Sequence, residues 1–293
     1  MQIFLRKYLI LLALILPISS ISQEDKIIEI KQSGGSRQDQ DKFPGANILF
    51  KTANQRVILF HNGAFIESDL AYFYSKDNYF SALGNVIFTQ GDSLKMTCNS
   101  IKYDGKKQLA LANGDVYLER PDMSLSTEKL NLDRINNEAF YDTKGVIIDS
   151  SSTLTSNNGV YFLNKKKYRF KSSVIIENPR YNVTSDQLDY LTEFNQAFLY
   201  DRSKITGDNY TIICDRGFYD LDLEKGIFKK NATLYYDNKI IKGDSLYFEK
   251  EKNYAAATKN VSILDSLNNS LITGNYGEIY KKKDSAIITQ RAL

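Results

Sequence analysis

The feature of this chain that most constrains its fold is an internal repeat of about 29 residues. Eight copies share a polar–apolar–polar pattern, and their central residues are Leu70, Ile101, Leu130, Gly159, Leu188, Gly217, Leu246 and Gly277. Neighbouring centres are 29 residues apart in five consecutive steps and 31 apart in the first and last steps. A fixed period of this size indicates a repeat architecture in which each copy packs on its neighbours.

Two columns of large residues recur in phase with this period. The position two residues after each centre is large and apolar or aromatic: Tyr72, Tyr103, Leu132, Tyr161, Tyr190, Tyr219, Phe248 and Ile279. The second half of the copies carries a phenylalanine column: Phe80, Phe140, Phe170, Phe198 and Phe228. Polar clusters such as 104–107 separate the halves, and Leu188 and Tyr190 alternate with Gln187 and Asp189. Each copy is therefore predicted to form two strands joined by a short turn.

A single two-stranded unit cannot bury its apolar face, but stacked copies share one continuous core. The predicted fold is all-β, a solenoid of stacked antiparallel strands built from eight repeats over residues 46–293. The only cysteines, Cys98 and Cys214, occupy the same column four repeats apart. A strand spacing of about 4.8 Å separates them by at least about 19 Å. A disulfide cannot span that distance, so two free, unreactive thiols are expected.

The first 22 residues differ from the rest of the chain. Arg6 and Lys7 precede an apolar run over 8–16, and small residues follow at 20–22. This order is typical of a secretory signal peptide, here expected over 1–22 and followed by a linker over 23–45. No later stretch is long and apolar enough to span a bilayer. The protein is therefore expected to be exported.

Charge and titratable residues argue against nucleic-acid binding and catalysis. The chain has 38 Lys and Arg against 35 Asp and Glu, a formal net charge of +3, so no nucleic-acid partner is expected. Asp186, Asp215 and Asp244 form a column, but the other copies carry Ser, Asn or Glu there, as hydrogen bonding in turns or ladders allows. His61 is the only histidine. We expect no catalytic residues, no metal site and no cofactor.

Two groups of residues resemble a known family. One is the segment Val57–Phe65 continuing into Ala71–Tyr74, and the other comprises the short motifs Gly84-Asn85-Val86, Gly91-Asp92-Ser93-Leu94 and Gly243-Asp244-Ser245-Leu246. Together they resemble the OstA-like (organic solvent tolerance) family, which is related to LptA-type periplasmic lipopolysaccharide-transport proteins. The resemblance covers roughly residues 45–293. It implies a V-shaped, open β-jellyroll that bridges the two membranes and shields the acyl chains of lipid A.

This resemblance gives the repeated apolar columns an expected role in binding lipid. The expected lipid-binding residues are Leu70, Tyr72, Ile101, Tyr103, Leu130, Leu132, Tyr161, Leu188, Tyr190, Tyr219, Leu246, Phe248, Phe80, Phe140, Phe170, Phe198 and Phe228. The sequence leaves open whether they line a groove or fill a closed core. It also leaves open a structural or adhesive surface solenoid that binds no lipid.

The expected partners follow from the same family and from the ends of the strand stack. They are lipopolysaccharide or lipid A, other lipopolysaccharide-transport proteins joined by strand-edge pairing, and further copies of this chain joined head to tail. The expected location is the periplasm, and association with the outer membrane is left open.

Overall fold

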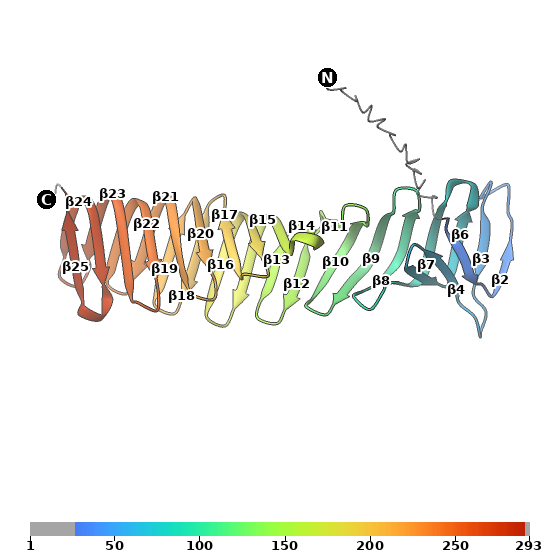
Figure 1. The fold of residues 1–293 in the computed structure, drawn as a ribbon, viewed down its shortest axis with the longest axis horizontal. Helices are drawn as coiled ribbons and strands as arrows, with labels where there is room; N and C mark the ends of the chain where they lie inside the picture. The colour runs from blue at the N-terminus through green and yellow to red at the C-terminus, as the bar shows by residue number, and fades with distance from the viewer. Residues whose placement is uncertain (1–26, 291–293) are drawn as a thin grey trace, which may run out of the picture.

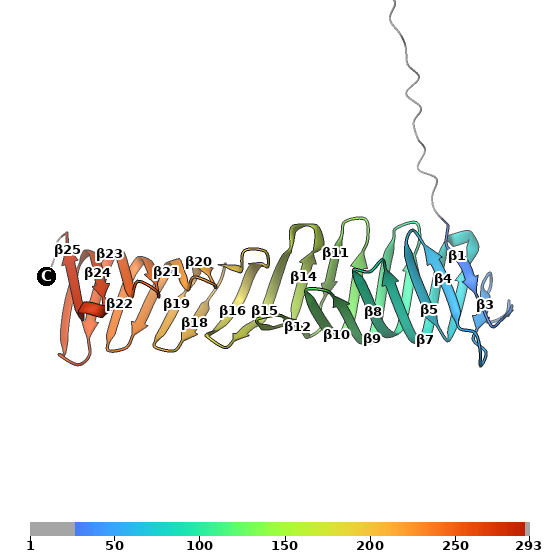
Figure 2. The same cartoon turned by 60° about the horizontal axis from the view of Figure 1, so that its bottom comes forward.

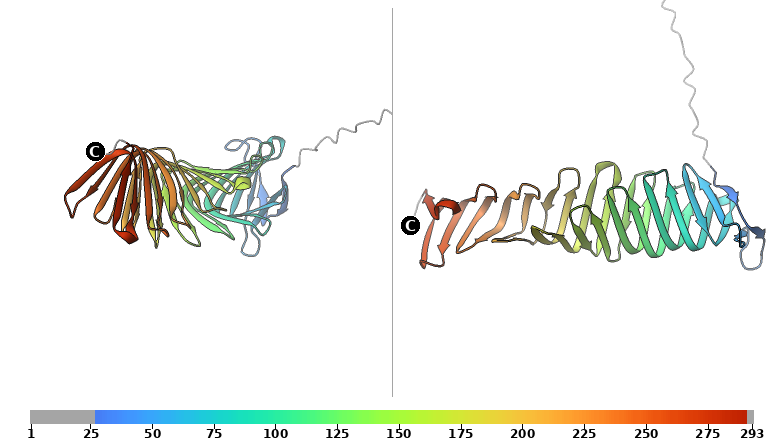
Figure 3. Two further views of the ribbon diagram at one scale, coloured as in Figure 1. Left: turned by 60° about the vertical axis from the view of Figure 1, so that its left-hand side comes forward. Right: turned by 90° about the horizontal axis from the view of Figure 1, so that it is seen from below.

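A computed structural model describes residues 27–290, which form an elongated rod with the two ends of the described chain at opposite ends (Figure 1). One antiparallel sheet of 25 strands runs along the whole rod. The strands cross its long axis in each of the other views (Figures 2 and 3). The prediction of an all-β stack of antiparallel strands is confirmed.

The first third of the rod contains short strands followed by the first long hairpins. Its elements are β1 (Glu29–Gln32), β2 (Gly35–Arg37), β3 (Asn47–Phe50), β4 (Val57–His61), β5 (Ala64–Ser68), β6 (Leu70–Tyr74), the 3₁₀ turn η1 (Ser75–Asp77), β7 (Tyr79–Gln90), β8 (Leu94–Asp104), β9 (Leu109–Arg120) and β10 (Met123–Asp133).

In the middle of the rod some strands are divided into two shorter strands, whereas others run unbroken. The elements here are β11 (Glu138–Tyr141), β12 (Gly145–Asp149), β13 (Thr153–Ser156), β14 (Asn158–Phe162), η2 (Leu163–Lys165), β15 (Lys167–Asn178), β16 (Tyr181–Leu191), β17 (Gln196–Leu199), β18 (Ser203–Gly207), β19 (Tyr210–Cys214) and β20 (Arg216–Asp220). The last part contains β21 (Lys225–Tyr236), β22 (Lys239–Glu249), β23 (Tyr254–Asp265), β24 (Ser270–Tyr280), η3 (Lys281–Lys283) and β25 (Ser285–Thr289).

Most long strands bend once near their middle, and the aligned bends fold the sheet into two facing arms. In β7 the register with β8 shifts between Leu83 and Val86. Gly84 and Asn85 lie at this bend with φ of 79° and 47°. Gly and Asn adopt this left-handed conformation more readily than other residues, which explains the Gly-Asn pair in the sequence. Along each bent strand, the two residues at the bend thus lie between the inward-facing residues of one arm and those of the other.

The inner surface of one arm, here called the aliphatic arm, is a continuous row of mostly branched side chains. Each residue of the row pairs in register with the next: Leu59, Ile66, Phe88, Met96, Leu118, Leu125, Ile147, Leu154, Ile176, Val183, Ile205, Ile212, Leu234, Ile241, Ile263 and Ile272. β-branched residues pack well on a pleated surface, so this arm presents an even apolar wall.

The opposite arm, here called the aromatic arm, carries a row in which large and small residues alternate over most of its length. In order along the rod they are Phe73, Phe80, Tyr103, Ala110, Leu132, Ala139, Tyr161, Tyr168, Tyr190, Ala197, Tyr219, Gly226, Phe248, Ala255, Ile279 and Ala286. A small residue on one strand leaves room for the ring on the next. A Cβ on Gly226, for example, would collide with the carbonyl oxygen of Phe218 and would lie 2.9 Å from the ring of Phe228 and 3.1 Å from the ring of Tyr219.

The N-terminal segments differ partly from the expectation. The signal peptide expected over 1–22 lies outside the described residues. In the described part of 23–45, expected as a linker, the structure instead places two strands, because β1 pairs with β4 and β2 pairs with β3. Edge strands this short and polar give a weak hydrophobic pattern, which is why the sequence did not reveal them.

Both cysteines are free and buried, as predicted. Burial raises the pKa of Cys98 to about 11 and the pKa of Cys214 to about 12. At pH 8 only about one thiol in a thousand or fewer is then the reactive thiolate. We expect iodoacetamide to label neither cysteine in the folded protein at pH 8 and both in urea, as counted by mass spectrometry. Rapid labelling of either thiol in the folded state would show that the core is not packed as described.

Candidate functional site

Most of the residues predicted to line the interior face inward between the two arms. Those that are buried there are Ile101, Tyr103, Leu130, Leu132, Tyr161, Leu188, Tyr190, Tyr219, Leu246, Phe248, Phe80, Phe170 and Phe228. The column two residues after each repeat centre coincides with the aromatic row from Tyr103 to Ile279. The sequence therefore identified most of the large residues of one inner row of the rod, but not Phe73 or Tyr168.

Four predicted residues lie on the outer surface instead. In the first copy Ala71 and Phe73 are buried, so Leu70 and Tyr72 point outward, and the ring of Tyr72 packs on Phe43. The sequence phase was wrong by one residue there, and one residue reverses the face of a strand.

Phe140 and Phe198 are the other two outward residues. Phe140 is 42% exposed, and Phe198 packs on Phe218 outside the core. Their neighbours on either side in the chain, which include Ala139 and Ala197, are buried. Alanine is the inner residue at these two positions of the aromatic row. The sequence pattern instead selected the adjacent phenylalanine, because it is the larger residue.

The two arms are in contact along the rod, so the interior is filled rather than an open trough. Ring pairs cross between the arms: the centroids of Tyr210 and Phe248 are 4.6 Å apart, and those of Tyr181 and Tyr219 are 6.3 Å apart. Of the two arrangements that the sequence left open, the closed core describes this conformation over most of its length.

One apolar pocket interrupts this packing near the middle of the rod. Both arms line it, with Leu94, Leu118, Arg120, Met123, Leu125 and Ile147 from the aliphatic arm and Leu132, Ala139, Tyr141, Tyr161, Leu163 and Tyr168 from the aromatic arm. Its unfilled volume is about 10 Å³. This is barely enough for a single water molecule.

A polar vestibule opens directly above this apolar pocket. It has a volume of about 170 Å³, and it shares Leu94, Arg120, Leu132 and Leu163 with the pocket. Its other residues are Gln90, Ser93, Asp133, Arg134, Asn137 and Asn164. The carboxylate of Asp133 accepts hydrogen bonds from the backbone of Ile135 and Asn136, so it is directed toward its own turn. Apolar and polar surfaces thus meet at one opening between the arms.

The pocket lies at one of the two places where three large residues follow one another in the aromatic row; the other is Phe73, Phe80 and Tyr103 near the N-terminal end. Tyr161, Tyr168 and Tyr190 follow one another on three adjacent strands. Their rings stack, with centroids 4.4 Å apart for the first pair and 6.4 Å for the second. Three adjacent rings therefore line the aromatic side of the pocket without an intervening Ala or Gly.

On the N-terminal side of the vestibule, hydrogen bonds tie the tips of the two arms together; we call this group the N-terminal latch. Arg134, on the aromatic arm, donates from Nε to Gln90 Oε1 at 3.0 Å and from Nη2 to the Asn62 carbonyl at 2.7 Å. Its Nη1 donates to the hydroxyl of Tyr103 at 2.7 Å, and that hydroxyl lies 2.7 Å from His61 Nδ1. A single guanidinium therefore links the turn after β4 and the end of β7 to the opposite arm.

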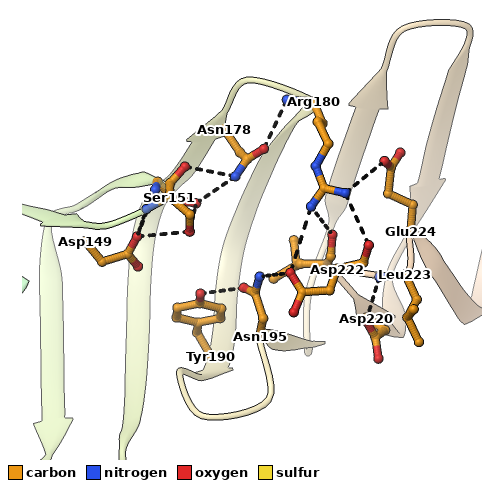
Figure 4. Close-up of polar contacts among 12 residues, drawn as sticks. Asp149, Ser151, Asn178, Arg180, Tyr190, Asn195, Asp220, Asp222, Leu223 and Glu224 are labelled. Carbon is orange, nitrogen blue, oxygen red and sulfur yellow. Dashed lines mark hydrogen bonds and ion pairs between the residues drawn. The ribbon is translucent and has the colours of Figure 1, made fainter. Parts of the chain in front are cut away.

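A second group of contacts, the C-terminal latch, joins the tips from Arg180 onward (Figure 4). Arg180 donates to the carbonyls of Leu221 and Asp222 at 3.3 and 3.2 Å, and its Nη1 lies 3.5 Å from the Glu224 carboxylate. The hydroxyl of Tyr210 donates to Glu224 at 2.9 Å. Farther along the rod Lys281 pairs with Asp237 at 2.7 Å.

The sequence did not single out Arg134, Arg180 or Glu224. Each lies in or beside a polar turn, where a charged residue is normally solvated, and only the packing of one arm tip against the other reveals its role.

The described residues contain no cluster that suggests metal binding. No group of three or more His, Cys, Asp or Glu side chains could hold a metal ion in this part of the chain. The carboxylates of Asp215 and Asp244 accept hydrogen bonds from Asn231 and Asn260 across the bends, a ladder contact of the kind the sequence suggested. His61 is buried against Tyr103. No helix between residues 27 and 290 is long and apolar enough to cross a membrane.

Comparison with known proteins places the chain in a family. No curated protein matches it. Among solved structures it is similar to the crystal structure of LptH, the LptA-homologous periplasmic component of the lipopolysaccharide transport device of Pseudomonas aeruginosa. The identity is 15% and the TM-score 0.22, over 46% of this chain and 79% of that one, which is too distant to support an argument. The model of the OstA-like protein family, however, matches residues 25–186, more than half of the 293 residues. As the motifs between residues 57 and 94 predict, the chain belongs to the OstA-like protein family.

Proposed function

We propose that this protein is a non-catalytic carrier that binds lipopolysaccharide through the acyl chains of lipid A and forms part of a bridge between membranes in the periplasm. Membership of the OstA-like family supports the transport role. The observation that carries the proposal is the pair of facing apolar rows, which run the length of the rod between two arms that are continuous with each other at the bends of the strands.

The energetics of the cargo explain why such an interior suits a carrier. Exposing an acyl chain of about a dozen CH₂ groups to water costs about 10 kcal/mol, at roughly 0.8 kcal/mol for each group. A row of aliphatic side chains facing a row of rings offers a replacement for water along the whole chain. The sugar portion would remain outside, between the polar tips of the arms.

The ends of the rod support assembly with other copies or with partner proteins. At the C-terminal end β25 pairs only with β24 among the described strands, and at the N-terminal end β2 pairs only with β3. A strand with an unpaired edge can extend the sheet into another chain. Head-to-tail stacking of this kind would continue both apolar rows from one molecule to the next.

The filled interior favours a second candidate function, a structural or adhesive solenoid that binds no lipid. A carrier must separate its arms to admit an acyl chain, whereas a scaffold never does so. The two functions therefore differ in whether lipid reaches the inner rows.

Photo-crosslinking separates these two functions. With p-benzoylphenylalanine at Tyr161, we expect ultraviolet light to produce a lipopolysaccharide adduct in cells that make this glycolipid, detected by immunoblot. The same probe at Phe198, on the outer surface, is the control and should give little adduct. No adduct at Tyr161 in a protein with a native circular dichroism spectrum would favour the scaffold.

A further inference from the structure

The contacts that hold the two arms together are unevenly distributed along the rod. The N-terminal latch lies on one side of the apolar pocket and the C-terminal latch on the other. Within residues 27–290, no hydrogen bond or ion pair joins the aliphatic-arm tips at 120–123 and 149–153 to the aromatic-arm tips at 162–167 and 191–196. Only the Arg120 guanidinium reaches across, 5.8 Å from the centre of the Tyr161 ring.

An acyl chain can enter only where the arms separate, because the unfilled volume of the pocket is about 10 Å³. Separation requires the least work where the fewest polar contacts must break. The interval between the latches meets this condition, and it also contains the apolar pocket. The arms should therefore part at this interval before they part elsewhere.

The chemistry of the same interval matches an amphiphile with a negatively charged head. Leu118, Leu125 and Ile147 form an apolar wall at depth, and the vestibule above them contains two guanidinium groups, those of Arg120 and Arg134. Its single carboxylate, Asp133, is occupied by its own turn. Among the described residues, the hydrogen bonds and ion pairs of Arg120 comprise one long contact with Asp122 at 3.4 Å, so most of its donors are available to a phosphate or carboxylate.

We infer that the interval between the latches, here called the portal, is the place where an amphiphile enters the interior, its acyl chain in the apolar pocket and its anionic head on Arg120. The inference rests on the proposed lipid-carrier function and adds to it a location and a charge preference. In the part of the rod held by the C-terminal latch, where Tyr210 and Phe248 pack across the arms, the interior stays closed during the first binding step.

The chain has no tryptophan, so a single introduced one reports on its own surroundings. The reporter variants are Tyr161→Trp in the portal and Phe248→Trp, which lies in the same aromatic row in the part of the rod held by the C-terminal latch. The probe is dodecyl phosphate brominated near the chain terminus, since bromine quenches tryptophan only at close range. We expect the probe to reduce the emission of Tyr161→Trp by more than half and to leave Phe248→Trp almost unchanged. Leu163→Trp, at a half-buried portal position, repeats the measurement if Tyr161→Trp does not fold.

Head-group preference is tested with Arg120→Gln in the reporter background. This variant should raise the concentration of dodecyl phosphate for half-maximal quenching about five- to tenfold. It should not change the value for an equally brominated dodecyl maltoside, which is neutral. Inorganic phosphate alone should quench neither reporter.

The outcomes distinguish the inference from the function beneath it. Equal or stronger quenching of Phe248→Trp, with binding confirmed by equilibrium dialysis, would overturn the portal and leave the carrier function standing. An unchanged affinity in Arg120→Gln would overturn the assigned head-group site. No binding of the probe, together with no lipopolysaccharide adduct at Tyr161, would refute the carrier function and the portal with it.

Discussion

Replacing Phe228 with alanine is expected to lower the free energy of unfolding by about 3–5 kcal/mol. The ring is fully buried, packs 6.0 Å from the ring of Tyr219 and fills space that Gly217 and Gly226 leave open. Neighbouring strands are held in register by the rest of the sheet, so they cannot collapse into the cavity. The full free-energy cost of losing the buried ring and leaving a cavity should therefore be measured in urea unfolding. Hydrogen exchange should increase first in β20, β21 and β22.

The matched control is Phe140→Ala. Both phenylalanines belong to the column that the sequence predicted to be internal, but Phe140 is 42% exposed on the outer surface. Its replacement should cost about 1 kcal/mol or less. Similar losses for the two variants would mean that the faces of these strands have been assigned wrongly.

The overall fold could be predicted because a solenoid repeats one local rule. Alternation with period two selects the inner face, and the fixed 29-residue spacing brings equivalent residues onto neighbouring strands. Tyr103, Leu132 and Tyr161 could therefore be placed in one row from the repeat spacing alone. Large side chains report this row reliably because burying them contributes most to stability.

The errors in face assignment arose where large side chains are absent from the inner row. Ala139 and Ala197 are the inner residues of their strands, and a neighbouring phenylalanine resembles the column better than an alanine does. In the first copy Leu70 was assigned to the inner face in place of Ala71 for the same reason. Small residues are required there by the rings on adjacent strands, and that requirement becomes visible only when the register between strands is known.

The latches were beyond prediction for a different reason. Arg134 contacts carbonyls 72 and 73 residues earlier in the chain, and Arg180 contacts a carbonyl 41 residues later. These partners depend on how far the two arms close, which is a property of the packed interior rather than of any repeat. Sequence periodicity describes one arm at a time and carries no information about the angle between them.

Removal of the guanidinium in Arg134→Ala is expected to lower the free energy of unfolding by about 3 kcal/mol. The change removes one hydrogen-bond donor from each of four acceptors: the Gln90 side chain, the carbonyls of His61 and Asn62, and the Tyr103 hydroxyl. Hydrogen bonds to a charged group contribute about 1.5–3 kcal/mol each, but water can replace part of them at the arm tips. Urea unfolding gives the total, and hydrogen exchange in β4, β8 and β10 gives its location. Arg216→Ala, at an exposed arginine, is the control and should change stability by less than about 0.5 kcal/mol.

A double-mutant cycle with Tyr103→Phe tests whether the network acts as a unit. Because Arg134 Nη1 can only donate, the Tyr103 hydroxyl accepts from it and keeps its own proton for His61 Nδ1. Burial raises the pKa of Tyr103, so this hydroxyl stays neutral at physiological pH. Tyr103→Phe should therefore lose about 1–2 kcal/mol alone, and the double variant should be more stable than the sum of the two losses predicts, by about 1 kcal/mol. Strictly additive losses would show that Arg134 and Tyr103 stabilise the rod independently, and the N-terminal latch would then not hold the arms together as one element.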